Sequence, residues 1–270
     1  MKKFRHLFLL LAALLPVSTV GFAKKNADLT KYVDPMIGTA FTGHTFPGAT
    51  YPFGMIQLSP DNGLDGWEVC SGYHYDKPFI YGFSHTHLNG TGCADLCDVL
   101  LQPVADYSAA AINENEYRSE YSHGGDDEKA TPGYYSVKLK RWGVNAELTT
   151  GRRAAMHHYA YGNKAAADNE VVIDLTLREP LIDGYIRQVD DHAVSGLRRS
   201  RFWASDQSVF FYAEFSEPIQ GIRYDEERPR ASRSETLVRP LKALLSFGKK
   251  TDVYVRIGIS SVSEENARLN

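Results

Sequence analysis

Residues 252–260 read Asp-Val-Tyr-Val-Arg-Ile-Gly-Ile-Ser, and apolar side chains occupy every second position from Val253 to Ile259. The stretch 134–139 repeats this alternation, with Tyr135, Val137 and Leu139 as its apolar members. Such alternation is typical of a strand with one buried face. Further β-rich runs lie at 170–177 and 209–215, separated by Gly, Pro, Asn and Asp clusters. Few windows show helical periodicity, so the sequence predicts an all-β fold: a β-sandwich of two packed, mainly antiparallel sheets.

The composition restricts the class of protein. The chain has 270 residues, 43% of them hydrophobic and 23% charged, which is enough to bury a core and too apolar for a disordered chain. Its 30 basic and 33 acidic side chains give a net charge of −3. Proteins that neutralise nucleic-acid phosphates are normally basic, so we expect no nucleic-acid partner. The polar segment Asn113–Ala130 is predicted to be a solvated loop.

The N-terminus has the organisation of an export signal. Lys2, Lys3 and Arg5 precede an apolar region at 7–15, and small residues flank Phe22 before a cleavage point near Ala23. The alternative is a membrane anchor, but the uncharged stretch of 17 residues at 7–23 is short for a bilayer and contains a proline. We therefore expect residues 1–23 to be a cleaved signal peptide and the mature protein to be periplasmic or secreted, with no membrane segment.

Three cysteines, Cys70, Cys93 and Cys97, are an odd number for an oxidising compartment. Cys93 and Cys97 can pair only if the backbone between them turns. We favour two thiols packed as small apolar groups, with a reactive thiol as the less favoured alternative.

A helix is expected at the C-terminus. Ser261 and Ser263 precede Glu264 and Glu265, an arrangement that starts helices, and the chain stops at Asn270. This helix is either a short terminal element docked on the sandwich or the entry into a second, helical region. We favour the second alternative, and so expect a sandwich over 24–262 and the start of a linker helix over 263–270.

Glycine and histidine crowd into one segment of the chain. Ten of the 22 glycines and four of the nine histidines lie between Gly38 and Gly92. Glycine permits backbone conformations and close approaches that regular strands do not need, so this segment is expected to form shaped loops that carry a site.

His85 and His87 allow two interpretations. In an extended segment both imidazoles face one side, as in zinc or copper sites, and His74 or Asp95 could supply a third ligand. The alternative is that they form hydrogen bonds to the backbone or to a sugar hydroxyl. No HExxH motif accompanies the pair, so we favour hydrogen bonding and predict no metal ligands.

Aromatic residues of the same segment raise a second possibility. An aromatic face beside polar groups is suited to a pyranose ring, whereas buried aromatics are common in any β-protein core. Trp67 is the best candidate for sugar contact, because a Gly- and Asp-rich loop precedes it. The other aromatics considered are Tyr73, Tyr75 and Phe83.

Glycoside hydrolysis needs two carboxylates on either side of the scissile bond. Six acidic residues lie in or near the loops, and their spacing singles out no pair, so we predict no catalytic residue in this chain. They are Asp34, Asp61, Asp65, Glu68, Asp95 and Asp98. Nucleophile-elbow, phosphate-loop and dinucleotide motifs are absent from the sequence.

Several motifs in this order strongly resemble glycoside hydrolase family 92, the exo-acting α-mannosidases. They are Val33–Thr39, Gly43–Thr50, Pro52–Asp61, Ser71–Tyr75 and Gly82–Leu88, with later similarities at Arg198–Ser200, Trp203–Ala204, Asp206–Gln207, Phe211–Phe215 and Val255–Asn266. The resemblance covers essentially all of the mature chain. One departure is Cys97, where the resemblance leads us to expect glycine.

The resemblance implies a two-domain, calcium-dependent, inverting enzyme with an N-terminal sandwich and a larger (α/α)6 barrel. The barrel carries the acid and base and most calcium ligands, so this chain alone is expected to be inactive. It implies α-mannoside glycans as partners and a barrel expected in cis. We carry over a substrate-contact role to Gly43, His44, Trp67, His85, Thr86, His87 and Asn89. The alternative function is a mannoside-binding module without catalysis.

Overall fold

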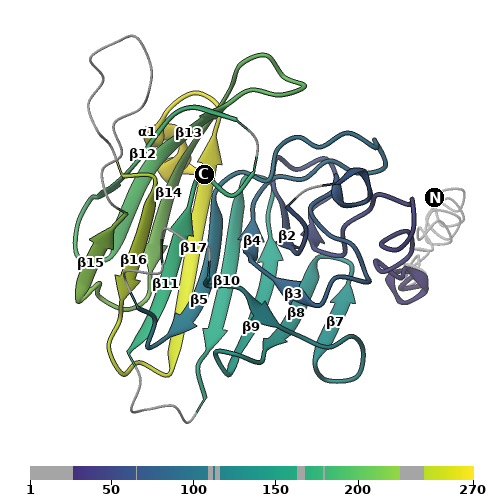
Figure 1. Cartoon of the computed structure of the whole chain (residues 1–270), viewed down its shortest axis with the longest axis horizontal. Helices are drawn as coiled ribbons and strands as arrows, with labels where there is room; N and C mark the ends of the chain where they lie inside the picture. The colour runs from purple at the N-terminus through teal and green to yellow at the C-terminus, as the bar shows by residue number, and fades with distance from the viewer. Residues whose placement is uncertain are drawn as a thin grey trace, which may run out of the picture.

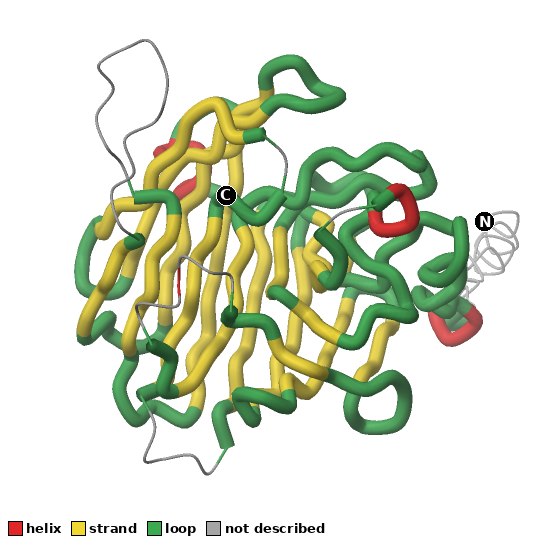
Figure 2. Tube along the Cα trace, viewed as in Figure 1, coloured by secondary structure: helices red, strands yellow, loops and turns green. Residues whose placement is uncertain are grey.

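The computed structural model describes residues 27–64, 66–108, 112, 116–162, 168–178, 180–225 and 240–270. The predicted signal peptide and Asp65 therefore lie outside the described residues. In the part of the chain that is described, no helix combines the length and the apolar character that crossing a bilayer requires. Strands dominate the described chain, and loops gather at one end of it (Figures 1 and 2).

Two large sheets form the molecule, and every neighbouring pair of strands within them is antiparallel. In pairing order, the eight-stranded sheet contains β12 (Leu181–Gln188), β13 (Ala193–Ser200), β14 (Gln207–Phe215), β17 (Asp252–Ser260), β10 (Ala154–Ala160), β9 (Val144–Thr150), β8 (Tyr134–Leu139) and β7 (Glu128–Thr131). The seven-stranded sheet contains β1 (Ala49–Thr50), β2 (Gln57–Asp61), β4 (Gly82–Ser84), β5 (Leu100–Ala105), β11 (Asn169–Asp174), β16 (Lys242–Ser246) and β15 (Gly221–Tyr224). A small pair is formed by β3 (Phe79–Ile80) and β6 (Ser119–Glu120).

The alternation found in the sequence sets the inner faces of the sheets. Val253, Val255 and Ile257 of β17 are fully buried, while Tyr254 between them is 47% exposed. Buried residues of both sheets form one hydrophobic cluster. Each buried Val, Ile or Leu contributes about 1.5–3 kcal/mol relative to an exposed position. The predicted β-sandwich is thereby confirmed.

The prediction of a solvated loop at Asn113–Ala130 is wrong for part of the described segment, where side chains are buried or strands form. Tyr117 is fully buried and donates a 2.5 Å hydrogen bond to Asp174 of β11, and the Trp142 indole donates to the Tyr117 carbonyl at 2.8 Å. The segment also supplies β6 and most of β7, the first strand of the β7–β8 hairpin. All residues of β5 and β11 are buried, so this segment covers the face of the sheet that points away from the core. The segment is polar in composition, but its aromatic side chains bury their rings and form hydrogen bonds through their hydroxyl groups.

The expected C-terminal helix is present as α1 (Glu264–Leu269). The Ser263 hydroxyl caps it by accepting from the backbone amide of Asn266 at 3.1 Å. Ala267 is buried where α1 packs against β17 and β14. Two short 3-10 helices complete the described elements: η1 (Thr30–Tyr32) and η2 (Trp67–Val69).

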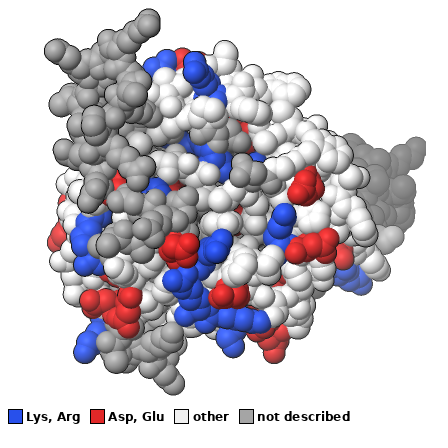
Figure 3. All heavy atoms as spheres, viewed as in Figure 1, with Lys and Arg blue, Asp and Glu red and all other residues white. Residues whose placement is uncertain are grey.

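The surface carries both signs of charge. On the face shown in Figure 3, basic side chains in the lower part of the view lie among acidic ones, and much of the remaining surface is uncharged. This mixture agrees with the near-neutral total charge of the sequence.

Candidate functional site

The glycine-rich segment forms the loops at the right of Figure 1, beyond the ends of β2 and β4. At the centre of these loops the imidazole of His44 meets the indole of Trp67 edge to face, with ring centroids 4.1 Å apart and an interplanar angle of 87°. Trp67 remains 58% exposed, whereas His44 is only 6% exposed. The pair therefore presents the aromatic face of Trp67 to solvent, with the buried imidazole of His44 packed against the indole.

Glycines make this arrangement possible. A Cβ on Gly43 would lie 2.1 Å from the Gly38 carbonyl oxygen, so only glycine permits the two segments to cross here. Gly92 has a φ of +64°, and a Cβ there would lie 3.0 Å from the indole nitrogen of Trp67. The close approach to Gly38 thus explains the glycine at position 43. The absence of a side chain at Gly92 leaves room beside the aromatic pair.

One polar atom beside this pair lacks a partner. Nε2 of His44 is buried and forms no hydrogen bond with any of the described residues. Burying an unsatisfied polar atom costs about 1–3 kcal/mol, so this nitrogen is suited to a ligand that brings its own hydroxyl. Gly90 donates its amide to the His44 carbonyl at 2.6 Å, which places the exposed Asn89 next to the same site. His44, Trp67 and Asn89 form the site that we define as the aromatic site.

His85 lies elsewhere, in the interior. It is fully buried, its Nδ1 bonds the Val99 carbonyl at 2.6 Å, and its Nε2 lies 3.0 Å from Nε2 of His157. Burial lowers the pKa of His85 to about 4, so the ring is neutral at physiological pH. The expectation that His85 contacts a substrate does not fit this position, because both ring nitrogens already have protein partners.

Thr86 is also engaged internally. Its hydroxyl donates to Asp98 at 2.7 Å and accepts from the Asp98 amide at 3.0 Å. Asp98 in turn accepts from Arg198 at 2.5 Å and from Gln207 at 2.9 Å. The Thr86 side chain is thus part of a buried hydrogen-bond network and does not face solvent.

His87 has a fully buried side chain as well. Its ring nitrogens face the Gln57 carbonyl and the Asp61 carboxylate at 2.8 Å and 3.3 Å. The third ligands suggested for a His85–His87 metal site lie apart from it. His74 bonds the Phe41 carbonyl at 3.2 Å, and Asp95 accepts from the Ala204 amide at 2.9 Å. The structure therefore does not build that metal site.

The other predicted aromatics divide between core and surface. Tyr73 and Phe83 are core residues, and Tyr75 stacks on His123 with centroids 3.8 Å apart. Trp203, which the sequence offered only as part of a family motif and not as a candidate for sugar contact, is 76% exposed beside the Ala204–Asp95 contact. The signal for it was present, since Trp203 follows a run of charged residues and precedes Asp206.

The described acidic residues of these loops are held by protein partners. Asp61 pairs with His87, Asp98 with Arg198, and Glu68 with Lys77 at 3.7 Å. Asp34 accepts from the Met36 amide at 2.9 Å. The pKa values of Asp61 and Glu68 are both lowered, whereas glycoside hydrolysis uses one carboxyl group with a raised pKa and a second carboxylate opposite it.

Comparison with known proteins shows the family of this chain. The model of the glycosyl hydrolase family 92 N-terminal domain matches residues 32–260. The chain belongs to this family. The family 92 resemblance of its motifs is therefore confirmed.

Solved structures of family 92 share the fold. A family GH92 α-mannosidase from Bacteroides thetaiotaomicron, solved in complex with mannoimidazole, is 34% identical with a TM-score of 0.77, covering 89% of this chain and 33% of that one. The gh92 family glycosyl hydrolase ccman5 is 25% identical with a TM-score of 0.72, again covering 89% and 33%.

A curated relative is an uncharacterized secreted glycosidase from Arthroderma benhamiae, 34% identical over 163 residues. The match covers 57% of this chain and 20% of that protein. This family 92 chain thus spans about a third of the length of its solved relatives, and its match covers a fifth of the length of the curated one.

Proposed function

We propose that this chain is the N-terminal sandwich of an exported α-mannosidase and supplies one side of a mannose pocket. The observation that carries the proposal is the aromatic site: an exposed indole next to a buried imidazole nitrogen without a hydrogen-bond partner. A pyranose ring offers an apolar C–H face to stack on Trp67 and hydroxyls that pair with His44 and Asn89. His85, Thr86 and His87 support these loops from below.

The bond-breaking groups of the proposed enzyme belong to a second domain. We propose an (α/α)6 barrel in cis, reached through a linker helix that starts at residues 263–270, after a sandwich spanning 24–262. That barrel would supply an acid and a base for hydrolysis with inversion. In this proposal the described chain binds and orients mannose, and it performs no proton transfer at the glycosidic bond.

Calcium, which the family implies, does not fit the described loops. Calcium takes six to eight oxygen ligands in an open cage. Here the carboxylates of Asp61 and Asp98 are buried and bonded to His87 and Arg198, so neither offers such a cage. We therefore assign calcium binding to the proposed barrel and derive no step through the ion in this chain.

Binding and turnover test this proposal together. The chain expressed with residues 1–23 is expected to reach the periplasm of a bacterial host and to begin at Lys24, as N-terminal sequencing would show. It should release no mannose from α-mannobiose with or without calcium, while calorimetry detects weak binding of mannose. Release well above a buffer control would contradict the assignment of the acid and base to another domain.

Substitutions in the aromatic site test where mannose binds. We expect Trp67→Ala to weaken mannose binding by about tenfold or more, because about 1.4 kcal/mol of stacking corresponds to that factor. His44→Phe keeps the ring packing but removes Nε2, and should weaken binding as well. Tyr254→Ala is the matched control, since Tyr254 is an exposed aromatic on the outer face of β17. Equal losses in Trp67→Ala and Tyr254→Ala would contradict the site.

The alternative function is a mannoside-binding module that has no catalytic partner. The same aromatic site supports it. Adding a family 92 barrel in trans distinguishes the two functions: restored mannose release supports the half-pocket, and binding without any restored turnover supports the module.

A further inference from the structure

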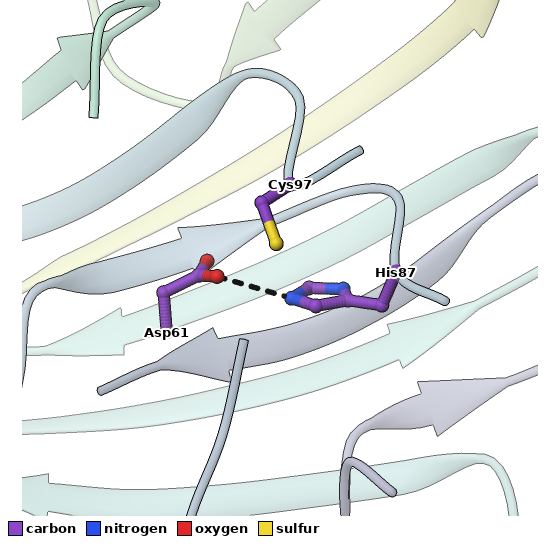
Figure 4. Close-up of side chains that lie close together, drawn as sticks. All are labelled: Asp61, His87 and Cys97. Carbon is purple, nitrogen blue, oxygen red and sulfur yellow. Dashed lines mark hydrogen bonds and ion pairs between the residues drawn. The ribbon is translucent and has the colours of Figure 1, made fainter. Parts of the chain in front are cut away.

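Three side chains that the aromatic site does not use converge in the interior. The ligand atoms of Asp61, His87 and Cys97 all lie within 4.8 Å of one another, and all three residues are buried. They come from β2, the loop after β4 and the segment before β5. Figure 4 shows the carboxylate, the imidazole and the sulfur pointing toward a common centre. Carboxylate oxygen, imidazole nitrogen and thiolate sulfur are the donor types that Zn²⁺ takes in proteins.

The hydrogen bonds of His87 orient its ring for a cation. Its Nδ1 lies 2.8 Å from the Gln57 carbonyl, which only accepts, so Nδ1 carries a proton. Nε2 then points at the Asp61 carboxylate, 3.3 Å away, and at the Ser84 hydroxyl, 3.1 Å away. The Nε2 lone pair of the neutral ring therefore points toward the Asp61 carboxylate, where both groups can bind one cation. Metal-binding histidines are fixed in this way, by a hydrogen bond from the other ring nitrogen to a carbonyl or carboxylate.

The carboxylate of Asp61 is also oriented toward the common centre. Its Oδ2 accepts from the Ser84 amide at 3.0 Å, and its Oδ1 is the oxygen that faces His87. These two contacts hold the carboxylate in a fixed orientation toward the centre.

Cys97 is placed there by an unusual backbone. Its φ is +55°, in the left-handed region that favours glycine, and its amide donates to the Thr86 carbonyl at 2.8 Å. The chain carries a side chain at a position where glycine would be less strained, and that side chain brings sulfur to the centre. None of the three cysteines forms a disulfide in the structure.

We propose that Asp61, His87 and Cys97 bind one Zn²⁺ ion. Zinc with bonds of about 2.0–2.3 Å in a tetrahedron sets its ligand atoms about 3.3–3.6 Å apart. The 3.3 Å between His87 and Asp61 already meets this spacing, and the sulfur needs to approach by no more than about 1.5 Å to complete it. A water molecule or the Ser84 hydroxyl takes the fourth position.

The ion would tie β2 to both loop segments beneath the aromatic site. This site is independent of the proposed mannose binding and of calcium, because sulfur and imidazole ligands favour zinc over hard cations. On binding, the Cys97 thiol loses its proton to solvent as the sulfur–zinc bond forms, and no electron is transferred. Zinc affinity should therefore rise with pH.

Metal titration of the full chain tests the proposal. After removal of metal with a chelator, we expect one equivalent of Zn²⁺ to bind and to raise the melting temperature. Co²⁺ in its place should give a near-ultraviolet thiolate-to-cobalt charge-transfer band. Cys97→Gly relieves the positive φ and should fold, yet it should lose the band and the zinc-induced shift in melting temperature. Asp61→Asn keeps the shape of the side chain and should also lose stoichiometric zinc.

Cys70→Ala and Cys93→Ala are the matched controls, because each removes a thiol outside the triad and should keep both signals. A wild-type chain that binds no zinc would overturn the proposal and leave a buried His87–Asp61 ion pair in its place. A charge-transfer band that persists in Cys97→Gly and disappears in Cys93→Ala would overturn it too, by moving the thiolate to another residue.

Discussion

At the scale of single residues, the loops under the aromatic site depend on one buried ion pair. Arg198 of β13 is 1% exposed and donates to Asp98, to Ser200 at 2.9 Å and to the Leu175 carbonyl at 3.0 Å. It also donates to the Arg178 carbonyl. These bonds offset the cost of taking a guanidinium out of water. Removing it would leave a buried carboxylate without its countercharge.

The neighbouring arginine offers a matched comparison. We expect Arg198→Ala to lower the free energy of unfolding by about 3–5 kcal/mol, because it strands a buried charge. Arg199→Ala breaks the exposed pair with Asp206, whose side chains are 41% and 49% exposed, and should cost less than about 1 kcal/mol. Urea denaturation of both variants gives the two values. Similar losses would show that the Asp98 pair does not stabilise the fold.

At the scale of elements, α1 is fixed to the eight-stranded sheet by a close contact. A Cβ on Gly258 of β17 would lie 2.1 Å from the Ala267 carbonyl oxygen, so the helix backbone rests directly on the strand. At the start of the helix, Glu264 accepts from Ser195 at 2.9 Å and also pairs with Tyr185 and Arg187. Contacts from β12, β13 and β17 thus hold α1 at its first residue and in its last turn.

Gly258→Ala should displace this helix. We expect a loss of about 1–3 kcal/mol in stability, as for other substitutions that overpack a tight contact, and faster proteolysis after Arg268. Gly221→Ala in β15 is the control, because a Cβ there meets no atom within 4 Å. Limited trypsin digestion with denaturation curves compares the two. Unchanged digestion of Gly258→Ala would mean that α1 tolerates a shift on β17.

At the scale of the whole molecule, a chain of hydrogen bonds crosses between the sheets. His85 donates from Nδ1 to Val99, so its Nε2 accepts from Nε2–H of His157, whose Nδ1 accepts from the Tyr159 hydroxyl at 2.8 Å. His157 and Tyr159 belong to β10 of the eight-stranded sheet, and His85 follows β4 of the other sheet. Burial lowers the pKa of both histidines, strongly so for His157. The neutral pair joins the two layers of the sandwich.

This pair predicts an acid-sensitive fold. Both histidines are neutral in the folded state, whereas they titrate near pH 6.5 when unfolded, so unfolding takes up protons as the pH falls. Their stability contribution is present above about pH 6.5 and is lost toward the folded pKa of His85, about 4. Each histidine should make the free energy of unfolding fall more steeply with decreasing pH, by up to about 1.4 kcal/mol per pH unit.

Denaturation between pH 7 and 5, above the range in which most carboxylates titrate, measures this loss. His157→Gln removes one of the two titrating groups and should make the slope shallower. A wild-type slope no steeper than that of the variant would contradict a neutral pair.

The sequence by itself determined the class of fold and the family. Alternating apolar residues in 134–139 and 252–260 specify strands because a period of two puts every second side chain on the buried face. The capping serine specifies the start of α1 for an equally local reason, since its hydroxyl satisfies an amide three residues away. The glycine-rich motifs located the site loops and indicated their relatives.

Only the tertiary structure decided which side chains of those loops face solvent. Trp67 comes to the surface over the buried ring of His44, while His85 and His87, equally prominent in the sequence, turn inward. Cys97 comes to lie against Asp61, 36 positions earlier in the chain. The physical reason is that irregular loops with positive φ at His44, Leu96 and Cys97 have no period from which side-chain direction follows. Direction there is set by packing against distant strands, which the local sequence does not record.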